Sequence, residues 1–160
     1  MEAKYIVIGI WALTLLAAAA SDLRSFRIPN ILPVILMLLF GAVHGLAGFP
    51  VPLWENLVHF AAALVVGMGL FGKGWVGGGD AKLYAAAALW FDWEGAIKLL
   101  FMTTSAGLIL AIAFIAARMM GLRKNVPKED RRIPYGVAIA AGAIFAAAWQ
   151  GGDRLFPAFS

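Results

Sequence analysis

The longest apolar run of the chain reads AIKLLFMTTSAGLILAIAFIAARMM and covers residues 96–120. Lys98 and Arg118 are its only charged residues, and they lie near its two ends. A helix needs about 20 predominantly apolar residues to cross the hydrocarbon core of a bilayer. This run therefore predicts a transmembrane helix, and the rest of the chain has to be judged against a membrane environment.

The composition of the whole chain agrees with this environment. Hydrophobic residues make up 62% of the 160 residues, and charged residues only 14%. Soluble domains hold about 45–50% apolar residues with glycine included and about 25% charged residues. The chain is thus expected to be a polytopic membrane protein, which excludes a soluble enzyme and a nucleic-acid binder. Because it has no cysteine, disulfides, thiolate metal sites and cysteine catalysis are excluded as well.

Five further apolar runs precede or follow the longest one, with short polar breaks between them. They cover residues 5–20, 31–46, 57–71, 81–91 and 135–149. We expect an all-α fold with six transmembrane helices, forming a single membrane-embedded domain over residues 1–160. The run over residues 81–91 is too short to span the bilayer alone.

The lysines and arginines predict the orientation of these helices. Ten of the 13 lie in three breaks that would share one side of the membrane, at residues 21–30, 72–82 and 118–134. Basic residues in short loops favour the cytoplasmic side. Both termini are therefore expected on the non-cytoplasmic side. Four tryptophans would then lie near the outer helix ends, as in an aromatic belt: Trp54, Trp90, Trp93 and Trp149.

An alternative interpretation concerns the first apolar run. Its N-terminal Lys4 and its end in Ala18-Ala19-Ala20 imitate a cleaved signal peptide. Cleavage there would move Asp22 to the outer side, whereas a retained first helix leaves Asp22 at the cytoplasmic end.

Two of the nine carboxylates have unusual surroundings. Asp22 lies in SDLRSFRIPN, residues 21–30, and Asp80 follows Gly77-Gly78-Gly79, both on the expected cytoplasmic side. If Trp90 marks the outer interface, the helical rise places Asp80 only about 15 Å inward, within a hydrocarbon core about 30 Å thick. Charged groups at such depth usually face a polar cavity.

Two carboxyl groups that face one cavity can share a proton near neutrality and activate water against a carbonyl carbon. The alternative is that the aspartates only form salt bridges with nearby basic residues, Asp22 with Arg24 or Arg27 and Asp80 with Lys82. His44 and His59 fall near the opposite side of the membrane, where we expect them to pack between helices. The serines have no evident base partner.

Three motifs resemble those of the type IV prepilin peptidase family, in the short form found with Tad-type (Flp) pilus systems. Asp22-Leu23-Arg24 followed by Ile28-Pro29-Asn30 resembles its first aspartate motif. Gly77-Gly78-Gly79-Asp80-Ala81-Lys82 resembles its second, Gly-x-Gly-Asp-x-Lys, and Ile133-Pro134-Tyr135-Gly136 resembles the motif that opens the last span. The second motif alone is weak, since presenilin-type proteases share Gly-x-Gly-Asp, but the three in this order are specific.

The resemblance implies a membrane aspartyl endopeptidase of the bacterial inner membrane, with its active site facing the cytoplasm. Such enzymes remove the short basic leader from prepilins and pseudopilins. Asp22 and Asp80 would be the catalytic pair. Eight residues would shape the site or bind substrate: Arg24, Pro29, Asn30, Gly77, Gly79, Lys82, Pro134 and Tyr135.

The partners implied are a prepilin substrate and membrane lipid, and neither a metal nor another cofactor is expected. Longer family members carry a cytoplasmic region with cysteine pairs and also methylate the new N-terminus. Since this chain has no cysteine, we expect no such region and no methyltransferase activity. Three alternatives stay open: a presenilin-like protease of other substrates, a small proton- or ion-conducting protein, and a non-catalytic assembly subunit.

Overall fold

The computed structural model describes residues 2–48, 53–121, 133–151 and 155–156. Within this part of the chain the regular structure is entirely α-helical, as the sequence predicts, and no strand occurs. The helices are α1 (Glu2–Ser25), α2 (Ile31–Leu46), α3 (Leu53–Gly72), α4 (Gly78–Ala88), α5 (Trp93–Met119) and α6 (Tyr135–Gln150). Each lies within a few residues of one expected apolar run. The basic residues 123–132 and Arg154, which contribute to the predicted orientation, lie outside the described residues.

Among the helices of the described residues, three are long and apolar enough to cross a membrane, namely α1, α3 and α5. The helices α2 and α6 are shorter apolar helices, and α4 is shorter still. Only 6% of the most apolar window of α5 and 11% of that of α3 are buried inside the molecule. Both helices therefore present broad apolar surfaces, as a lipid environment requires.

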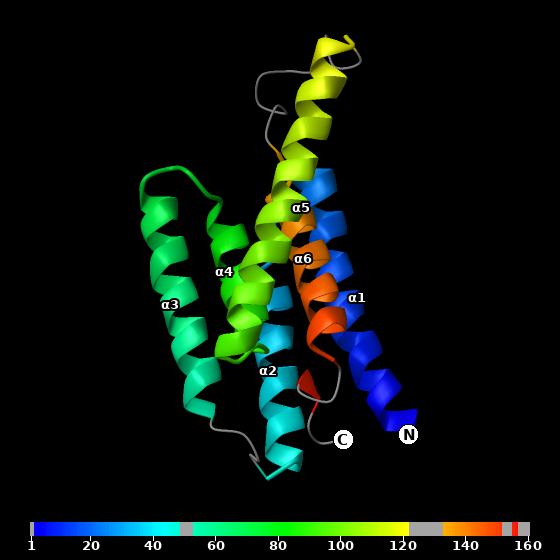
Figure 1. Ribbon diagram of the computed structural model, residues 1–160, viewed down its shortest axis with the longest axis vertical. Coiled ribbons are helices and arrows are strands. Elements are labelled where there is room, and N and C mark those ends of the chain that lie inside the picture. The colour runs from blue at the N-terminus through cyan, green and yellow to red at the C-terminus, as the bar shows by residue number, and fades with distance from the viewer. Residues whose placement is uncertain (1, 49–52, 122–132, 152–154, 157–160) are drawn as a thin grey trace.

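The helices form a bundle in which α4 and α6 are the most enclosed. In Figure 1, α6 lies between α1 and α5 and packs against both, while α4 lies beside α3 and also contacts α2 and α6. Most side chains of α4 are buried alanines, which allow neighbouring backbones to approach closely. A Cβ atom on Gly67 of α3 would lie only 2.9 Å from the Cβ atom of Ala81 in α4. Small residues thus decide how closely α3 and α4 pack.

Only three of the four tryptophans expected in the aromatic belt are exposed. Trp54, Trp93 and Trp149 are exposed, whereas Trp90 is 2% exposed. The Trp90 indole Nε1 donates a hydrogen bond of 3.2 Å to the Leu36 carbonyl oxygen. Because α4 already ends at Ala88, Trp90 lies in the turn before α5 and points into the core. Trp90 is therefore not an exposed belt residue, and the depth of Asp80 in the membrane stays a prediction.

The first helix is an integral part of the core. Trp11 and Leu15 of α1 are buried, and the Trp11 ring packs against Trp90 and Phe156. These contacts favour a retained helix over a cleaved signal peptide.

Both histidines are buried packing residues, as the sequence predicts. The Nδ1 atom of His44 lies 3.0 Å from the Phe40 carbonyl oxygen, and that of His59 lies 3.0 Å from the Phe91 carbonyl oxygen. Neither histidine lines the two cavities that Asp22 and Asp80 border.

Candidate active site

The end of α1 positions Asp22. The helix stops at Ser25, and Phe26 adopts a left-handed backbone with φ of 51° while its N–H donates to the Asp22 carbonyl oxygen at 2.9 Å. The Ser21 hydroxyl donates to the Arg27 carbonyl oxygen at 2.7 Å, which folds the following turn back onto the helix. Asp22 is thereby held one turn before the end of α1, where its side chain is 5% exposed.

The glycine run positions Asp80. Gly77 has an extended backbone and α4 begins at Gly78, so Asp80 lies in the first helical turn. A Cβ atom on Gly78 would lie 3.2 Å from the Phe71 ring, and one on Gly79 would lie 3.1 Å from the Cβ atom of Ile28. The three glycines are weak helix formers, yet they allow α4 to start in close contact with α3 and with the turn after α1. An acidic side chain in a first turn is also favoured by the helix dipole.

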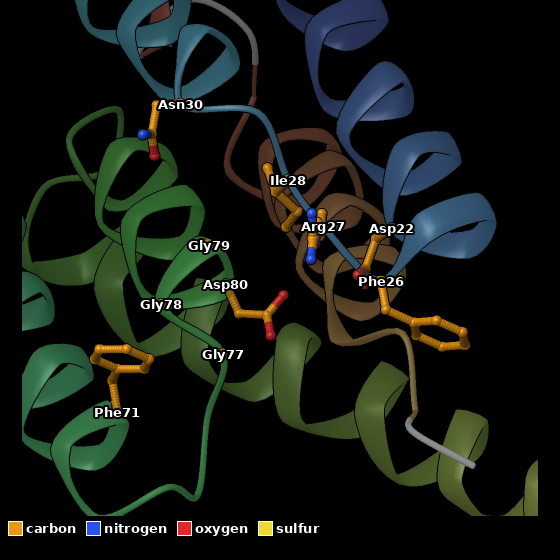
Figure 2. Close-up of a pocket in the computed structure, with 10 residues that line it drawn as sticks. All are labelled: Asp22, Phe26, Arg27, Ile28, Asn30, Phe71, Gly77, Gly78, Gly79 and Asp80. Carbon is orange, nitrogen blue, oxygen red and sulfur yellow. The ribbon is translucent and has the colours of Figure 1, made fainter. Parts of the chain in front are cut away.

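The two aspartates share the same cavities, although they come from different helices. One cavity has a volume of about 380 Å³ and another about 540 Å³, and both are lined by Asp22 and Asp80. Figure 2 shows the Asp80 carboxyl group pointing toward Asp22. Phe26, Phe71 and Gly77 also line both cavities. Both aspartates therefore border each of the two spaces, which substrate or water could fill.

The start of α6 supports Asp22 from the other side. The backbone N–H of Gly136 donates a hydrogen bond of 2.7 Å to Asp22 Oδ2. A Cβ atom at position 136 would lie 2.9 Å from that oxygen and 2.9 Å from Ile28 Cδ1. Only a glycine fits here without moving the aspartate.

The alternative of local salt bridges is wrong for both aspartates. Among the residues that the structure describes, neither carboxyl group forms an ion pair with a lysine or an arginine. Lys82 instead donates a hydrogen bond of 3.1 Å to Asn30 Oδ1, which links α4 to the end of the turn after α1. Arg24 and Arg27 are exposed.

The other expected site residues divide into two groups. Asn30, Gly77 and Gly79 line the smaller cavity, and Tyr135 lines the larger one. Four line neither cavity: Lys82 holds Asn30, the buried Pro134 precedes α6, and Arg24 and Pro29 are exposed.

Several cavity residues escaped the sequence analysis. Phe26, Ile28, Phe71 and Trp75 line one or both cavities, and Gly136 contacts Asp22 directly. Ile28 stands in the first motif and Gly136 in the third, so the motifs were usable signals for these two residues, whereas nothing in the sequence distinguishes the aromatic residues from ordinary membrane-facing ones. In the described part of the chain, no group of three or more histidine or acidic side chains could hold a metal ion.

One comparison with known proteins gives a match. The model of the type IV leader peptidase family matches residues 9–112. The matched segment contains both aspartates and the glycine run, and it ends before α6. No curated protein and no solved structure matches the chain.

Proposed function

Because the chain belongs to the type IV leader peptidase family, we propose that it is a membrane aspartic endopeptidase that removes the short basic leader of prepilins or pseudopilins. One observation carries the aspartic mechanism: Asp22 of α1 and Asp80 of α4 line the same two cavities. An acidic pair of this kind activates water without a nucleophilic side chain or a metal.

The proposed chemistry requires one ionised and one protonated carboxyl group. Two carboxylates in one cavity repel each other, so the pair retains a proton near neutral pH. The ionised member accepts a proton from water as the water oxygen attacks the scissile carbonyl carbon. The protonated member gives its proton to the carbonyl oxygen. The tetrahedral intermediate then collapses: one of its hydroxyl groups returns a proton to the carboxylate that is now ionised, the C–N bond breaks, and the other carboxyl group gives its proton to the leaving amine. The pair is left with one proton, as at the start.

The membrane setting proposed here follows the charge pattern. Six membrane-embedded helices with both termini outside would direct the aspartates toward the cytoplasm of a bacterial inner membrane. A basic leader joined to an apolar helix has its junction at this membrane surface. The three motifs further point to the short enzymes of Tad-type (Flp) pilus systems.

The decisive experiment is co-expression with candidate prepilins and measurement of leader removal by mass. Asp22→Asn and Asp80→Asn should each reduce cleavage at least about 10²-fold, since the amide cannot accept or donate the proton. Glu94→Gln is the matched control, because Glu94 forms an exposed pair with Lys98 on α5 and lines neither cavity. Cleavage at the parental rate by either aspartate variant would refute the pair. Proton flux into liposomes without cleavage of any prepilin would favour an ion-conducting protein instead.

A further inference from the structure

Phe26 has an unfavourable backbone conformation next to the aspartate pair. In the described part of the chain, it is the only residue other than glycine with a positive φ, at 51°. Bulky residues rarely adopt this region, while glycine adopts it without strain. Such conformations persist where the surroundings enforce them, and they cluster at functional sites. A glycine at position 26 would adopt this backbone conformation without strain. The presence of a phenylalanine there therefore indicates a role for its side chain other than stabilising the turn.

The Phe26 side chain lines both cavities that contain the aspartates. Phe71, in the last turn of α3, does the same. In Figure 2 the two rings lie on opposite sides of the Asp22 and Asp80 carboxyl groups. A peptide laid across the aspartate pair would therefore have an aromatic ring on each side.

The two cavities differ in chemistry. The larger one is lined by Trp75, Val76, Ile133 and Tyr135 in addition to the shared residues, and none of its described lining residues is basic. The smaller one includes Arg27 and Asn30. An apolar side chain is thus better accommodated in the larger cavity, where it can exclude water against aromatic rings.

We propose that Phe26 is a specificity-determining residue, whose ring forms the wall against which the apolar side chain following the scissile bond packs. The left-handed backbone of Phe26 holds this ring beside Asp22. Glycine, which this backbone conformation favours, would provide no ring there. This inference rests on the proposed function, because it places the substrate residue that follows the scissile bond in the larger cavity.

The test compares two prepilins, one with a large apolar residue after the scissile bond and one with alanine there. Phe26→Gly and Phe26→Asn both relieve the backbone strain and remove the ring. Their unfolding temperatures should equal or exceed that of the parent. Their kcat/KM on the first substrate should fall at least about tenfold, a typical effect of a lost apolar contact, and change little on the second. Phe26→Leu keeps an apolar side chain and should retain most of the preference.

Phe145→Ala serves as the control, since this exposed phenylalanine of α6 lines neither aspartate cavity. The inference is overturned if the Phe26 variants lose activity equally on both substrates, or if they keep the parental preference. An equal loss together with a lower unfolding temperature would mark Phe26 as a packing residue. If the parent enzyme cleaves neither prepilin, the proposed function fails, and this outcome is distinct from failure of the Phe26 variants alone.

Discussion

A single methyl group at Gly136 should slow leader removal substantially while leaving the protein folded. In Gly136→Ala the new Cβ atom would lie 2.9 Å from Asp22 Oδ2 and 3.0 Å from Asp22 Cβ, where ordinary contact begins at 3.4 Å. It would also lie 2.9 Å from Ile28 Cδ1. Asp22 is 5% exposed and borders the two cavities, so the carboxyl group can give way only toward that space. The carboxyl group must therefore shift, and the 2.7 Å hydrogen bond from the Gly136 N–H changes with it.

The size of the effect follows from these distances. Restoring ordinary contact requires a shift of about 0.5 Å, the difference between 2.9 and 3.4 Å. A misplacement of about 1 Å in a catalytic geometry can cost on the order of 10²-fold in rate, so we expect kcat/KM to fall about tenfold or more. Overpacking of this kind costs typically about 1–3 kcal/mol of stability. Part of that cost is offset, because alanine stabilises a helix relative to glycine by up to about 1 kcal/mol.

The assay pairs thermal unfolding of the purified protein in detergent with kcat/KM for leader removal. Gly142→Ala is the first control, since its Cβ atom would lie 2.5 Å from Thr103 Cα on α5 and contacts neither aspartate. It should lower the unfolding temperature but leave the activity per folded molecule intact. Gly69→Ala has no neighbouring atom within 4 Å of the new Cβ, so it should leave the activity unchanged and should raise the unfolding temperature only through the higher helix propensity of alanine. Parental kcat/KM in Gly136→Ala would refute the claim that the start of α6 positions Asp22.

Three further outcomes are expected. Gly79→Val should lose most of its leader cleavage, measured on folded protein, because the added side chain presses on Ile28 and displaces Asp80 from Asp22. Asp92→Ala should cost about 1–2 kcal/mol in thermal unfolding, since this carboxylate caps α5 at 2.7 Å, while cleavage per folded molecule stays unchanged. Activity should survive EDTA, and inactivation that zinc reverses would contradict the aspartic mechanism.

Much of the fold could be predicted from the sequence because it depends on local properties. The length of an apolar run can be compared directly with the thickness of a bilayer, and the six helices in the described part of the chain follow the six expected runs. The aspartate motifs could be recognised as well, since Asp22 and Asp80 are rare charged residues beside apolar segments. Their resemblance to leader peptidases agrees with the family match over residues 9–112.

The contacts between helices could not be predicted in the same way. The sequence suggests that Trp90 faces the membrane interface, yet the ring is buried. It gives no sign that Phe26 adopts a positive φ, and its third motif includes Gly136 without indicating that this residue donates to Asp22. Lipid tails are as apolar as leucine, so hydrophobicity does not determine which helices meet in a membrane. That choice depends on steric fit between small residues, such as Gly67 against Ala81. The sequence alone therefore determined that the chain is helical, suited to a membrane and equipped with two aspartate motifs, whereas only the packing of α1, α4 and α6 brought Asp22 and Asp80 into one site.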